Sequence, residues 1–458
     1  MSLIDSSDPR PVHFVGIAGA GMRALAELLS RRGVRVTGCD AAADDVEDLR
    51  AAGIDVAAGH DPAHVEGARA LVVTSAMPRE HPELARARAL GRPVIRRAEA
   101  LGEATAGAEL VAVAGTHGKS TTTVMTAEAL AAAGLDPTAL VGARVAGWRG
   151  NFRPGRPTLY VVEADEYDRS FLSLSPTVAV ITNVEADHLD IYRDLNDIRG
   201  AFAEFASGAR AVVVSADDEG AASLPLPASA DVVRFGIHSA KARLTAAALR
   251  QEEGGTRFDV RFDGARIGHV RLRVPGVHNV LNALAALGAG LAEGRTVAEL
   301  TPGLEAFGGV ERRFERVGDA GGVAVVDDYA HHPTEIAATI AAARDAFPGR
   351  RLVVAFQPHL YSRTRDFAPA FAAALAGADA IFLADIYPAR EQPMAGVSAD
   401  LIADRLGGAR DRLRWRGGRA AMADALAAFV REGDVVLTMG AGDVTRVGPA
   451  LLRLLGVR

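Results

Sequence analysis

The chain has 458 residues, with 51 basic and 57 acidic side chains and a formal net charge of −6. A general nucleic-acid binder needs a basic face, and a membrane helix needs an apolar run of roughly 18–20 residues, so we expect neither a nucleic-acid nor a membrane partner. The polar start predicts no signal peptide, and the lone Cys39, which cannot form an internal disulfide, favours a cytoplasmic protein.

The first hundred residues alternate short apolar runs with helical segments, which is the βαβ pattern of a parallel sheet. The predicted strands are Val12–Ile17, Val34–Cys39 and Leu71–Thr74, and the predicted helices are Met22–Arg32 and Val46–Ala52. The pattern weakens at Leu101–Gly107, where we expect a linker to a second domain.

A glycine-rich turn, Gly16–Gly21, joins the first strand to the first helix, and Asp40 ends the second strand. In dinucleotide-binding folds, glycines at this place let a phosphate approach the backbone. The spacing here is GxxGxG rather than GxGxxG. NAD, another nucleotide diphosphate and a packing turn without a ligand therefore all stay open.

The second domain begins with a strand, a glycine turn and an alanine-rich helix, at Leu110–Ala114, Gly115–Thr121 and Thr121–Ala133. The amides of such a turn and the helix N-terminus favour phosphate. Lys119 would bridge the β- and γ-phosphates of ATP, and the Ser120 hydroxyl would hold Mg²⁺. Lys119 and Lys241 are the only two lysines among the 51 basic residues. Since arginine does not replace lysine at a phosphate, the retained Lys119 supports an ATP site.

Two acidic segments follow predicted strands. Glu163–Glu166 comes after Thr158–Val162, and Asn183–His188 comes after Val178–Thr182. Because the carboxyl ends of parallel strands meet at one edge of a sheet, these carboxylates would bind metal beside the phosphate loop, with His188 as a further ligand. Solvated loops or helix caps are the alternative interpretation.

The rest of the second domain is predicted to hold a hairpin and a helix. Phe258–Val274 alternates apolar and polar residues, with Gly264 at the turn, which indicates an antiparallel hairpin. The amides of Asn279 and Asn282, in the following helix Asn279–Ala292, would read the adenine edge or act as helix caps. We expect the next domain boundary near Phe307–Gly309.

The C-terminal part repeats the strand–helix alternation. The predicted strands are Val323–Val326, Leu352–Ala355, Ala380–Leu383 and Val435–Thr438, and the predicted helices are Thr334–Ala346 and Ala370–Ala376. Two polar segments, Asp327–Pro333 and Gln357–Arg365, follow the first two strands. Their histidines, carboxylates and arginines predict the recognition of a small charged molecule, and a structural polar loop is the alternative interpretation. Paired histidines can also bind zinc, but no cysteine or HExxH pattern supports zinc in this part of the chain.

These motifs together resemble the Mur ligases, the ATP-dependent amide-bond formers of peptidoglycan precursor assembly. The resemblance runs from about Val12 to about Gly442 and rests on eight ordered segments. They are GIAGAGM at Gly16–Met22, AGTHGKSTTT at Ala114–Thr123, EADEYDRSFL at Glu163–Leu172, TNVEADHLDIY at Thr182–Tyr192, HNVLNA at His278–Ala283, GGVERRFE at Gly308–Glu315, DDYAHHPTEI at Asp327–Ile336 and FQPHLYSRTRDF at Phe356–Phe367. DDYAHHP and QPHLYSRT favour the alanine-adding branch of the family.

The resemblance implies that ATP phosphorylates the lactyl carboxylate of UDP-N-acetylmuramate and that L-alanine then attacks the acyl phosphate. The implied catalytic residues are Lys119, Glu163, His188 and Arg313, and the implied Mg²⁺ ligands are Ser120, Glu163 and His188. The implied ATP contacts are Gly115, Thr116, His117, Gly118, Lys119, Ser120, Thr121, Asn279, Asn282 and Asp328. The implied contacts are Gly19, Gly21, Met22, Asp40, Ser75 and Asn151 for the UDP-sugar, and Tyr329, His331, His359 and Arg363 for the amino acid.

The expected architecture is therefore three α/β domains. Residues 1–105 would form a Rossmann-like UDP-sugar domain, residues 106–309 a central P-loop ATPase-type domain, and residues 310–458 a Rossmann-like domain that binds the amino acid and nucleotide. We expect a monomer or a weak homodimer. Three alternatives stay open: a muropeptide-recycling ligase that adds a tripeptide to the same UDP-sugar, a nucleotide sensor without turnover, and an NAD-dependent dehydrogenase based on the first domain alone.

Overall fold

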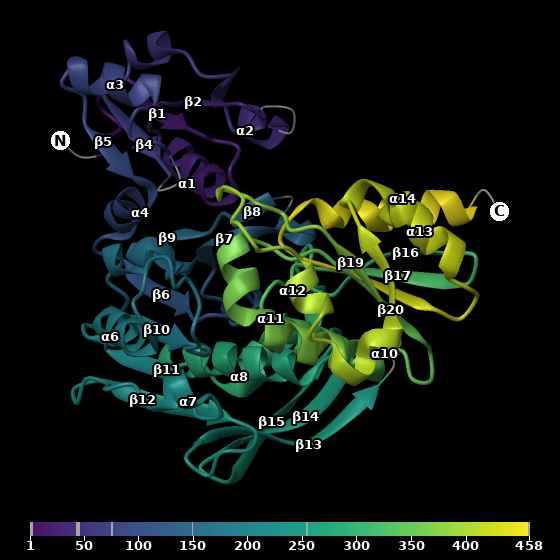
Figure 1. Ribbon diagram of the computed structural model, residues 1–458. Coiled ribbons are helices and arrows are strands. Elements are labelled where there is room, and N and C mark those ends of the chain that lie inside the picture. The colour runs from purple at the N-terminus through teal and green to yellow at the C-terminus, as the bar shows by residue number, and fades with distance from the viewer. Residues whose placement is uncertain (1–2, 43–45, 75–76, 149, 253–254, 457–458) are drawn as a thin grey trace. The chain divides into compact units, whose positions relative to one another are not determined.

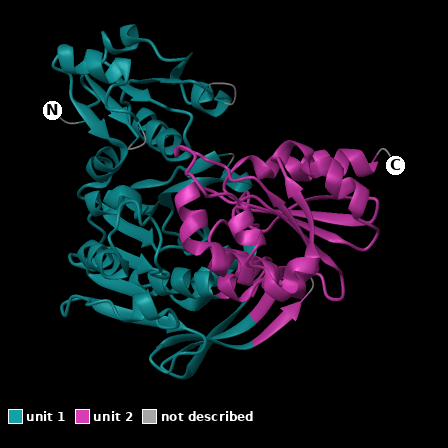
Figure 2. Ribbon diagram, viewed as in Figure 1, with its two compact units in different colours: residues 1–248, 258–270, 281–307 teal, residues 249–257, 271–280, 308–458 magenta. Residues whose placement is uncertain are grey.

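Three β-sheets follow one another along the chain (Figure 1). The computed structural model describes residues 3–42, 46–74, 77–148, 150–252 and 255–456. These residues group into two compact units: unit 1 is 1–248, 258–270 and 281–307, and unit 2 is 249–257, 271–280 and 308–458 (Figure 2). The predicted three-domain α/β class is confirmed, and the domain boundaries at 105/106 and 309/310 stay predictions.

The first sheet is a five-stranded parallel sheet with helical segments packed on both faces. Its order, β3-β2-β1-β4-β5, reverses beside β1, as in nucleotide-binding folds. Its strands are β1 (Val12–Val15), β2 (Val36–Asp40), β3 (Asp55–Ala58), β4 (Ala70–Val73) and β5 (Val94–Arg96). Its helical segments are α1 (Ala20–Arg31), α2 (Glu47–Ala51), η1 (Pro62–Val65), α3 (Pro82–Ala89) and α4 (Arg97–Thr105).

The second sheet has ten strands in the order β15-β14-β13-β12-β11-β10-β6-β9-β7-β8. Its strands are β6 (Glu109–Ala114), β7 (Pro137–Val145), β8 (Gly150–Arg153), β9 (Arg156–Glu163), β10 (Val178–Ile181), β11 (Ala211–Ser215), β12 (Asp231–Gly236), β13 (Leu244–Glu252), β14 (Gly255–Phe262) and β15 (Ala265–Leu272). The helical segments of this part are α5 (Lys119–Ala132), η2 (Ala146–Trp148), η3 (Tyr167–Ser173), α6 (Leu195–Ala206), α7 (Glu219–Ala222), α8 (Val277–Ala292) and α9 (Val297–Ala306).

The predicted hairpin is present as β14 and β15. Asp263 and Gly264 connect the two strands, with φ angles of 48° and 83°. Two central residues with positive φ match the right-handed twist of the strands they join, which is why an Asp-Gly pair favours this connection.

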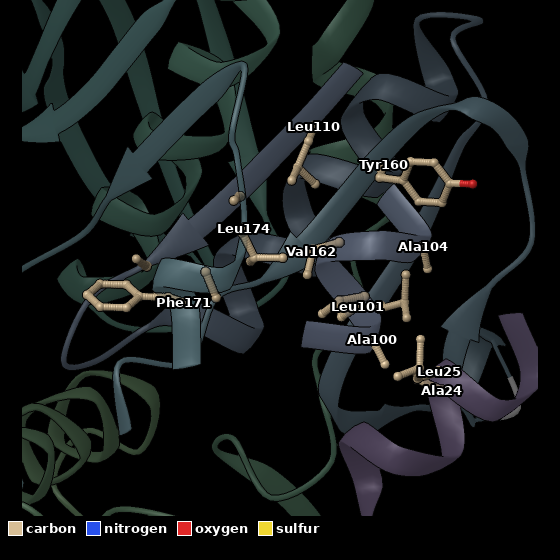
Figure 3. Packing of buried hydrophobic residues seen from close by; sticks show 14 of the residues in the cluster. Ala24, Leu25, Ala100, Leu101, Ala104, Leu110, Tyr160, Val162, Phe171 and Leu174 are labelled. Carbon is tan, nitrogen blue, oxygen red and sulfur yellow. The ribbon is translucent and has the colours of Figure 1, made fainter. Parts of the chain in front are cut away.

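The segment Leu101–Gly107 is not the linker that the sequence predicted. Helix α4 continues to Thr105, and Leu101 and Ala104 are buried in one hydrophobic cluster with Leu25 of α1 and Val162 of β9 (Figure 3). Short helices gain most of their stability from tertiary packing rather than from their own sequence. The weak periodicity of this segment therefore hid a helix that its neighbours stabilise.

The third sheet has six strands in the order β16-β17-β21-β18-β19-β20, and only its edge strand β16 pairs antiparallel. Its strands are β16 (Glu315–Ala320), β17 (Val323–Asp328), β18 (Leu352–Phe356), β19 (Ala380–Ala384), β20 (Leu413–Gly417) and β21 (Val435–Met439). Its helical segments are α10 (Pro333–Ala346), α11 (Tyr361–Leu375), α12 (Asp400–Ala403), η4 (Gly407–Arg412), η5 (Arg419–Ala421), α13 (Met422–Phe429), η6 (Asp443–Arg446) and α14 (Val447–Gly456). Among the described residues, no helix combines the length and apolar character that a membrane crossing requires.

Candidate functional site

The order of the second sheet gathers three loops at the carboxyl end of β6. Strand β6 lies between β9 and β10 and pairs in parallel with both. The loop after β6 starts α5, while Glu163 ends β9 and Asn183 follows β10. The two polar segments predicted from the sequence therefore flank the phosphate loop.

Two glycines give this loop its conformation. Gly115 has a φ of 144°, and a Cβ atom there would collide with the Thr182 hydroxyl. Gly118 precedes α5 with a φ of 81°, and its Cβ atom would lie 2.5 Å from Oδ1 of Asn282. Only glycine adopts these backbone angles without strain. The side chains of Thr182 and Asn282 also leave no room for a Cβ atom, so both positions require glycine.

Lys119 is held inside the loop by three acceptors. Its Nζ donates to the carbonyl oxygens of Gly115 and Thr116, at 2.7 and 3.2 Å, and pairs with Oε2 of Glu166 at 2.8 Å. Burial alone would lower the pKa of Lys119, but the carboxylates of Glu166 and Asp165 outweigh it and raise this pKa above its ordinary value. The same ion pair holds the pKa of Glu166 below its usual range although burial opposes this, so both groups are charged.

Two of the three predicted Mg²⁺ ligands, Ser120 and Glu163, contact each other directly. The Ser120 hydroxyl donates to Oε1 of Glu163 at 3.0 Å, and the Gly142 amide donates to Oε2 at 2.6 Å. Hydroxyl and carboxylate oxygens are donors that Mg²⁺ prefers, so this pair fits the ion. The predicted ligand His188 has a φ of 52° and places Nε2 3.6 Å from Oε1 of Glu166.

The remaining loop residues are tied to the segment after β10. The His117 amide donates to Oδ1 of Asn183 at 2.7 Å, and the Thr182 hydroxyl donates to the His117 carbonyl at 2.6 Å. The Glu185 amide donates to the Thr116 hydroxyl at 2.9 Å. These hydrogen bonds hold the first residues of the loop against the segment after β10.

The two predicted adenine contacts have different surroundings. Asn282 is buried and accepts a hydrogen bond from the Thr122 hydroxyl at 3.2 Å, beside Gly118 of the loop. Asn279 belongs to unit 2 and donates from Nδ2 to the Pro275 carbonyl at 2.7 Å. The geometry thus brings Asn282 to the phosphate loop, while Asn279 holds the start of α8.

In the first sheet, the predicted UDP-sugar residues surround the N-terminus of α1. Asp40 accepts hydrogen bonds from the amides of Ala18 and Ala42, each at 2.9 Å. Asn151, from β8, donates to the Ala20 carbonyl at 2.6 Å. Gly19 precedes the helix and Met22 is buried within it. The predicted contact Ser75 lies outside the described residues.

In the third sheet, Asp328 ends β17 as a buried, oriented acceptor. Its carboxylate accepts hydrogen bonds from the amides of Phe314 and Ala330, each at 2.7 Å. Burial raises the pKa of Asp328 to about 6, although the Arg313 charge opposes the shift. A carboxylate fixed by two backbone amides is suited to accept hydrogen bonds from the hydroxyls of a sugar.

Four predicted amino-acid contacts lie together in unit 2. The rings of Tyr329 and His331 are 5.2 Å apart, those of His331 and His359 are 5.9 Å apart, and Arg363 reaches Nδ1 of His359 at 3.4 Å. The Arg313 guanidinium lies 5.0 Å from the centre of the Tyr329 ring. The segments after β17 and β18 therefore meet, although β21 separates the two strands.

Two charged residues beside these sites were missing from the predicted set. Glu166 pairs with Lys119, and its position in the EADE segment was the available signal. The Arg97 guanidinium lies 3.0 Å from the place of a Cβ atom on Gly21. It puts a positive charge at the N-terminus of α1, and nothing in the local sequence pattern indicated this.

Comparisons with known proteins agree with this arrangement. Mur ligase models match three consecutive parts of the chain: the family's catalytic domain at residues 11–109, the middle domain at 113–290 and the glutamate ligase domain at 312–442. The UDP-N-acetylmuramate–L-alanine ligase of Kineococcus radiotolerans is 47% identical, covering 98% of this chain and 96% of the relative. The enzyme of the same name from Salinibacter ruber is 43% identical, covering 97% and 95%.

Two solved structures are similar over nearly the whole chain. The UDP-N-acetylmuramate-alanine ligase of Thermotoga maritima has a TM-score of 0.81 at 30% identity and covers 97% of this chain and 98% of its own. A murein peptide ligase from Psychrobacter arcticus has a TM-score of 0.71 at 25% identity and covers 98% and 99%.

Proposed function

The chain belongs to the Mur ligase family, and we propose that it joins L-alanine to the lactyl carboxylate of UDP-N-acetylmuramate while ATP is converted to ADP and phosphate. The observation that carries this proposal is the 47% identity to a named alanine ligase, which extends over 98% of the chain and so includes the Tyr329–Arg363 region. The braced phosphate loop beside Glu163 and Glu166 supports the ATP-dependent step.

The first step transfers the γ-phosphoryl group of ATP. A lactyl carboxylate oxygen forms a bond to the γ-phosphorus, the bond to the β-phosphate oxygen breaks, and ADP leaves. Such a transfer depends on alignment and charge stabilisation more than on covalent help. Lys119 and the loop amides would hold the phosphates, and Arg313 would stabilise the γ-phosphate charge. Ser120, Glu163 and His188 would hold Mg²⁺, which supplies further charge neutralisation when bound.

The second step forms the amide. The alanine amine attacks the carbonyl carbon of the acyl phosphate, a proton leaves the nitrogen, and inorganic phosphate departs. Arg363 is 5% exposed and lies beside His359, and a guanidinium is suited to bind the alanine carboxylate through two parallel hydrogen bonds. Tyr329 and His331 would complete this amino-acid site.

The proposal extends to the remaining substrate contacts. Asn279 and Asn282 would contact adenine, and the oriented carboxylate of Asp328 would bind the ribose. Gly19, Gly21 and Met22, at the N-terminus of α1, would bind the UDP-sugar diphosphate. Asp40, Ser75 and Asn151 would make further contacts with the UDP-sugar. We propose a cytoplasmic location, since the single, buried Cys39 suits a reducing compartment. We further propose that the protein is a monomer or a weak homodimer.

A substrate comparison tests the proposed reaction against the tripeptide-adding alternative. Purified full-length protein is incubated with ATP, Mg²⁺ and UDP-N-acetylmuramate, together with either L-alanine or the tripeptide, and phosphate release is measured. We expect release that depends on both L-alanine and the UDP-sugar. Phosphate release with the tripeptide but not with L-alanine would refute the proposed reaction in favour of the recycling reaction. Phosphate release without the UDP-sugar would indicate an ATPase that transfers no phosphate to this substrate.

A further inference from the structure

A second group of potential metal ligands lies in the first sheet, where the proposed reaction uses none of them. Four elements each contribute one side chain: β1, β2, η1 and α3. The potential ligand atoms of these residues all lie within 4.8 Å of one another. We call them the N-terminal cluster: His13, Cys39, His64 and Glu83.

The sheet geometry explains why these residues meet. In the register of β1 and β2, His13 is opposite Thr37 and Val15 is opposite Cys39, so His13 and Cys39 lie on one face of the sheet. Asp40, the proposed UDP-sugar residue, points to the other face. Segments η1 and α3 cover the His13 face, which brings the remaining two ligands over it.

Three of the potential ligands converge on a single carboxylate oxygen. Oε1 of Glu83 lies 3.1 Å from Sγ of Cys39, 2.8 Å from Nδ1 of His64 and 3.9 Å from Nε2 of His13. Ligands of a tetrahedral Zn²⁺ ion, at about 2.0–2.3 Å from the metal, lie roughly 3.3–3.8 Å from one another. Shifts of about 1 Å or less would therefore place all four ligands around one ion.

The burial of the cluster favours a cation there. Glu83 and Cys39 are 0% exposed and His13 is 2% exposed. Within the described residues, the ion-pair partners of Glu83 are histidines alone, with His60 and His81 facing Oε2 at 3.3 and 3.8 Å. A buried carboxylate is costly unless it is paired or coordinates a metal, and no lysine or arginine serves that purpose here.

His13 has the hydrogen bonding expected of a metal ligand. Its Nδ1 is 2.9 Å from the Thr37 hydroxyl, and its buried Nε2 has no hydrogen-bond partner in the described part of the chain. A histidine that binds a metal through one ring nitrogen typically hydrogen-bonds through the other, which fixes the ring orientation. Nε2 of His13 thus faces Oε1 of Glu83 at 3.9 Å, where it is oriented as a ligand atom.

We propose that this chain binds one Zn²⁺ ion at the N-terminal cluster, where it joins β1, β2, η1 and α3. The mixed sulfur, nitrogen and oxygen donors select zinc over Mg²⁺ or Ca²⁺, which prefer oxygen ligands alone. The side chains of His60 and His64 are 26% and 25% exposed and provide an entry path. This proposal is independent of the ligase reaction.

The single cysteine makes the site spectroscopically unique. Since Cys39 is the only cysteine in the chain, a thiolate-to-metal charge-transfer band can arise at no other place. Metal-free full-length protein is titrated with Co²⁺ without oxygen. We expect a near-ultraviolet charge-transfer band and the intense visible bands of tetrahedral Co²⁺, both saturating at one equivalent. Added Zn²⁺ should abolish both, whereas excess Mg²⁺ should leave them unchanged.

Three variants connect the signal to the named residues. Cys39→Ser should lose the charge-transfer band, and His64→Gln should bind Co²⁺ at least about tenfold more weakly, since even indirect partners of a metal contribute that much. His269→Gln is the matched control, because this exposed histidine lies on β15, outside the cluster. At equal concentration, Zn²⁺ should raise the thermal unfolding midpoint of His64→Gln less than that of the wild type and of His269→Gln.

A wild-type protein without the charge-transfer band would overturn the proposal and leave the cluster as a hydrogen-bond network. Equal Co²⁺ affinities for His64→Gln and His269→Gln would overturn it as well. Circular dichroism confirms that each variant is folded. Should Cys39→Ser fail to fold, the comparison of the two histidine variants decides, since His64 is partly exposed and glutamine can keep its hydrogen bond to Glu83.

Discussion

Replacing Lys119 by arginine keeps the positive charge but should remove most of the ligase activity. The Nζ atom lies 2.7 Å from the Gly115 carbonyl, 3.2 Å from the Thr116 carbonyl and 2.8 Å from Oε2 of Glu166. Three acceptors therefore converge on one atom. A planar guanidinium directs its hydrogen bonds outward as a fork and cannot reproduce this point charge, so it would also be misplaced for the ATP phosphates.

Both the reaction rate and the stability of the fold should fall. Loss of one well-placed donor to transition-state charge lowers kcat by about 10²–10³-fold, or about 2.7–4 kcal/mol. Lys119→Met should in addition destabilise the fold, because Glu166 is 2% exposed and removing one partner of a buried ion pair costs about 3–5 kcal/mol. The double variant Lys119→Met/Glu166→Gln should regain much of this stability.

Steady-state phosphate release with saturating substrates measures kcat, and urea unfolding measures stability. The chain supplies its own control: Lys241 is the only other lysine and is exposed, so Lys241→Arg should change neither quantity. A wild-type kcat in Lys119→Arg would refute the reasoning that the loop requires a compact ammonium group. An unchanged unfolding free energy in Lys119→Met would refute the stabilising role of its ion pair with Glu166.

Further predictions concern the loop, pH and the amino-acid site. Ser120→Thr should keep full activity, whereas Ser120→Ala should raise the Mg²⁺ concentration for half-maximal rate by about tenfold or more; equal Mg²⁺ curves would exclude the hydroxyl as a ligand. Gly118→Ala should cost about 1–3 kcal/mol in urea unfolding, because of its φ of 81° and the contact with Asn282. Burial raises the pKa of Asp328 from 3.8 to about 6, so about 3 kcal/mol of stability is present below pH 3.8 and is lost as the pH rises to about 6. Asp328→Asn should flatten that part of the unfolding profile, and an unchanged slope would contradict the shift. Arg363→Gln should raise the KM for L-alanine about tenfold or more at an unchanged KM for ATP, since a charged hydrogen bond contributes about 1.5–3 kcal/mol; kinetics identical to wild type would remove Arg363 from the site.

The local pattern was enough to predict the phosphate loop. An apolar run, two glycines and an alanine-rich stretch predict strand, turn and helix, and the structure has β6, the loop and α5 in these places. The hairpin at Asp263 and Gly264 was predictable for the same reason, since alternation and turn residues act within a few positions. The segment Leu101–Gly107 was misjudged because its helix depends on distant side chains.

The sequence by itself determined the family, the order of the motifs and the chemistry that each strand end offers, because these depend on residue types and short spacings. Only the tertiary structure decided which strand ends meet. The order β10-β6-β9 places Glu166 beside Lys119, and the packing of α3 and η1 brings His64 and Glu83 to Cys39. Strand order and helix packing arise from the burial of apolar faces across the whole domain, so no local pattern records them.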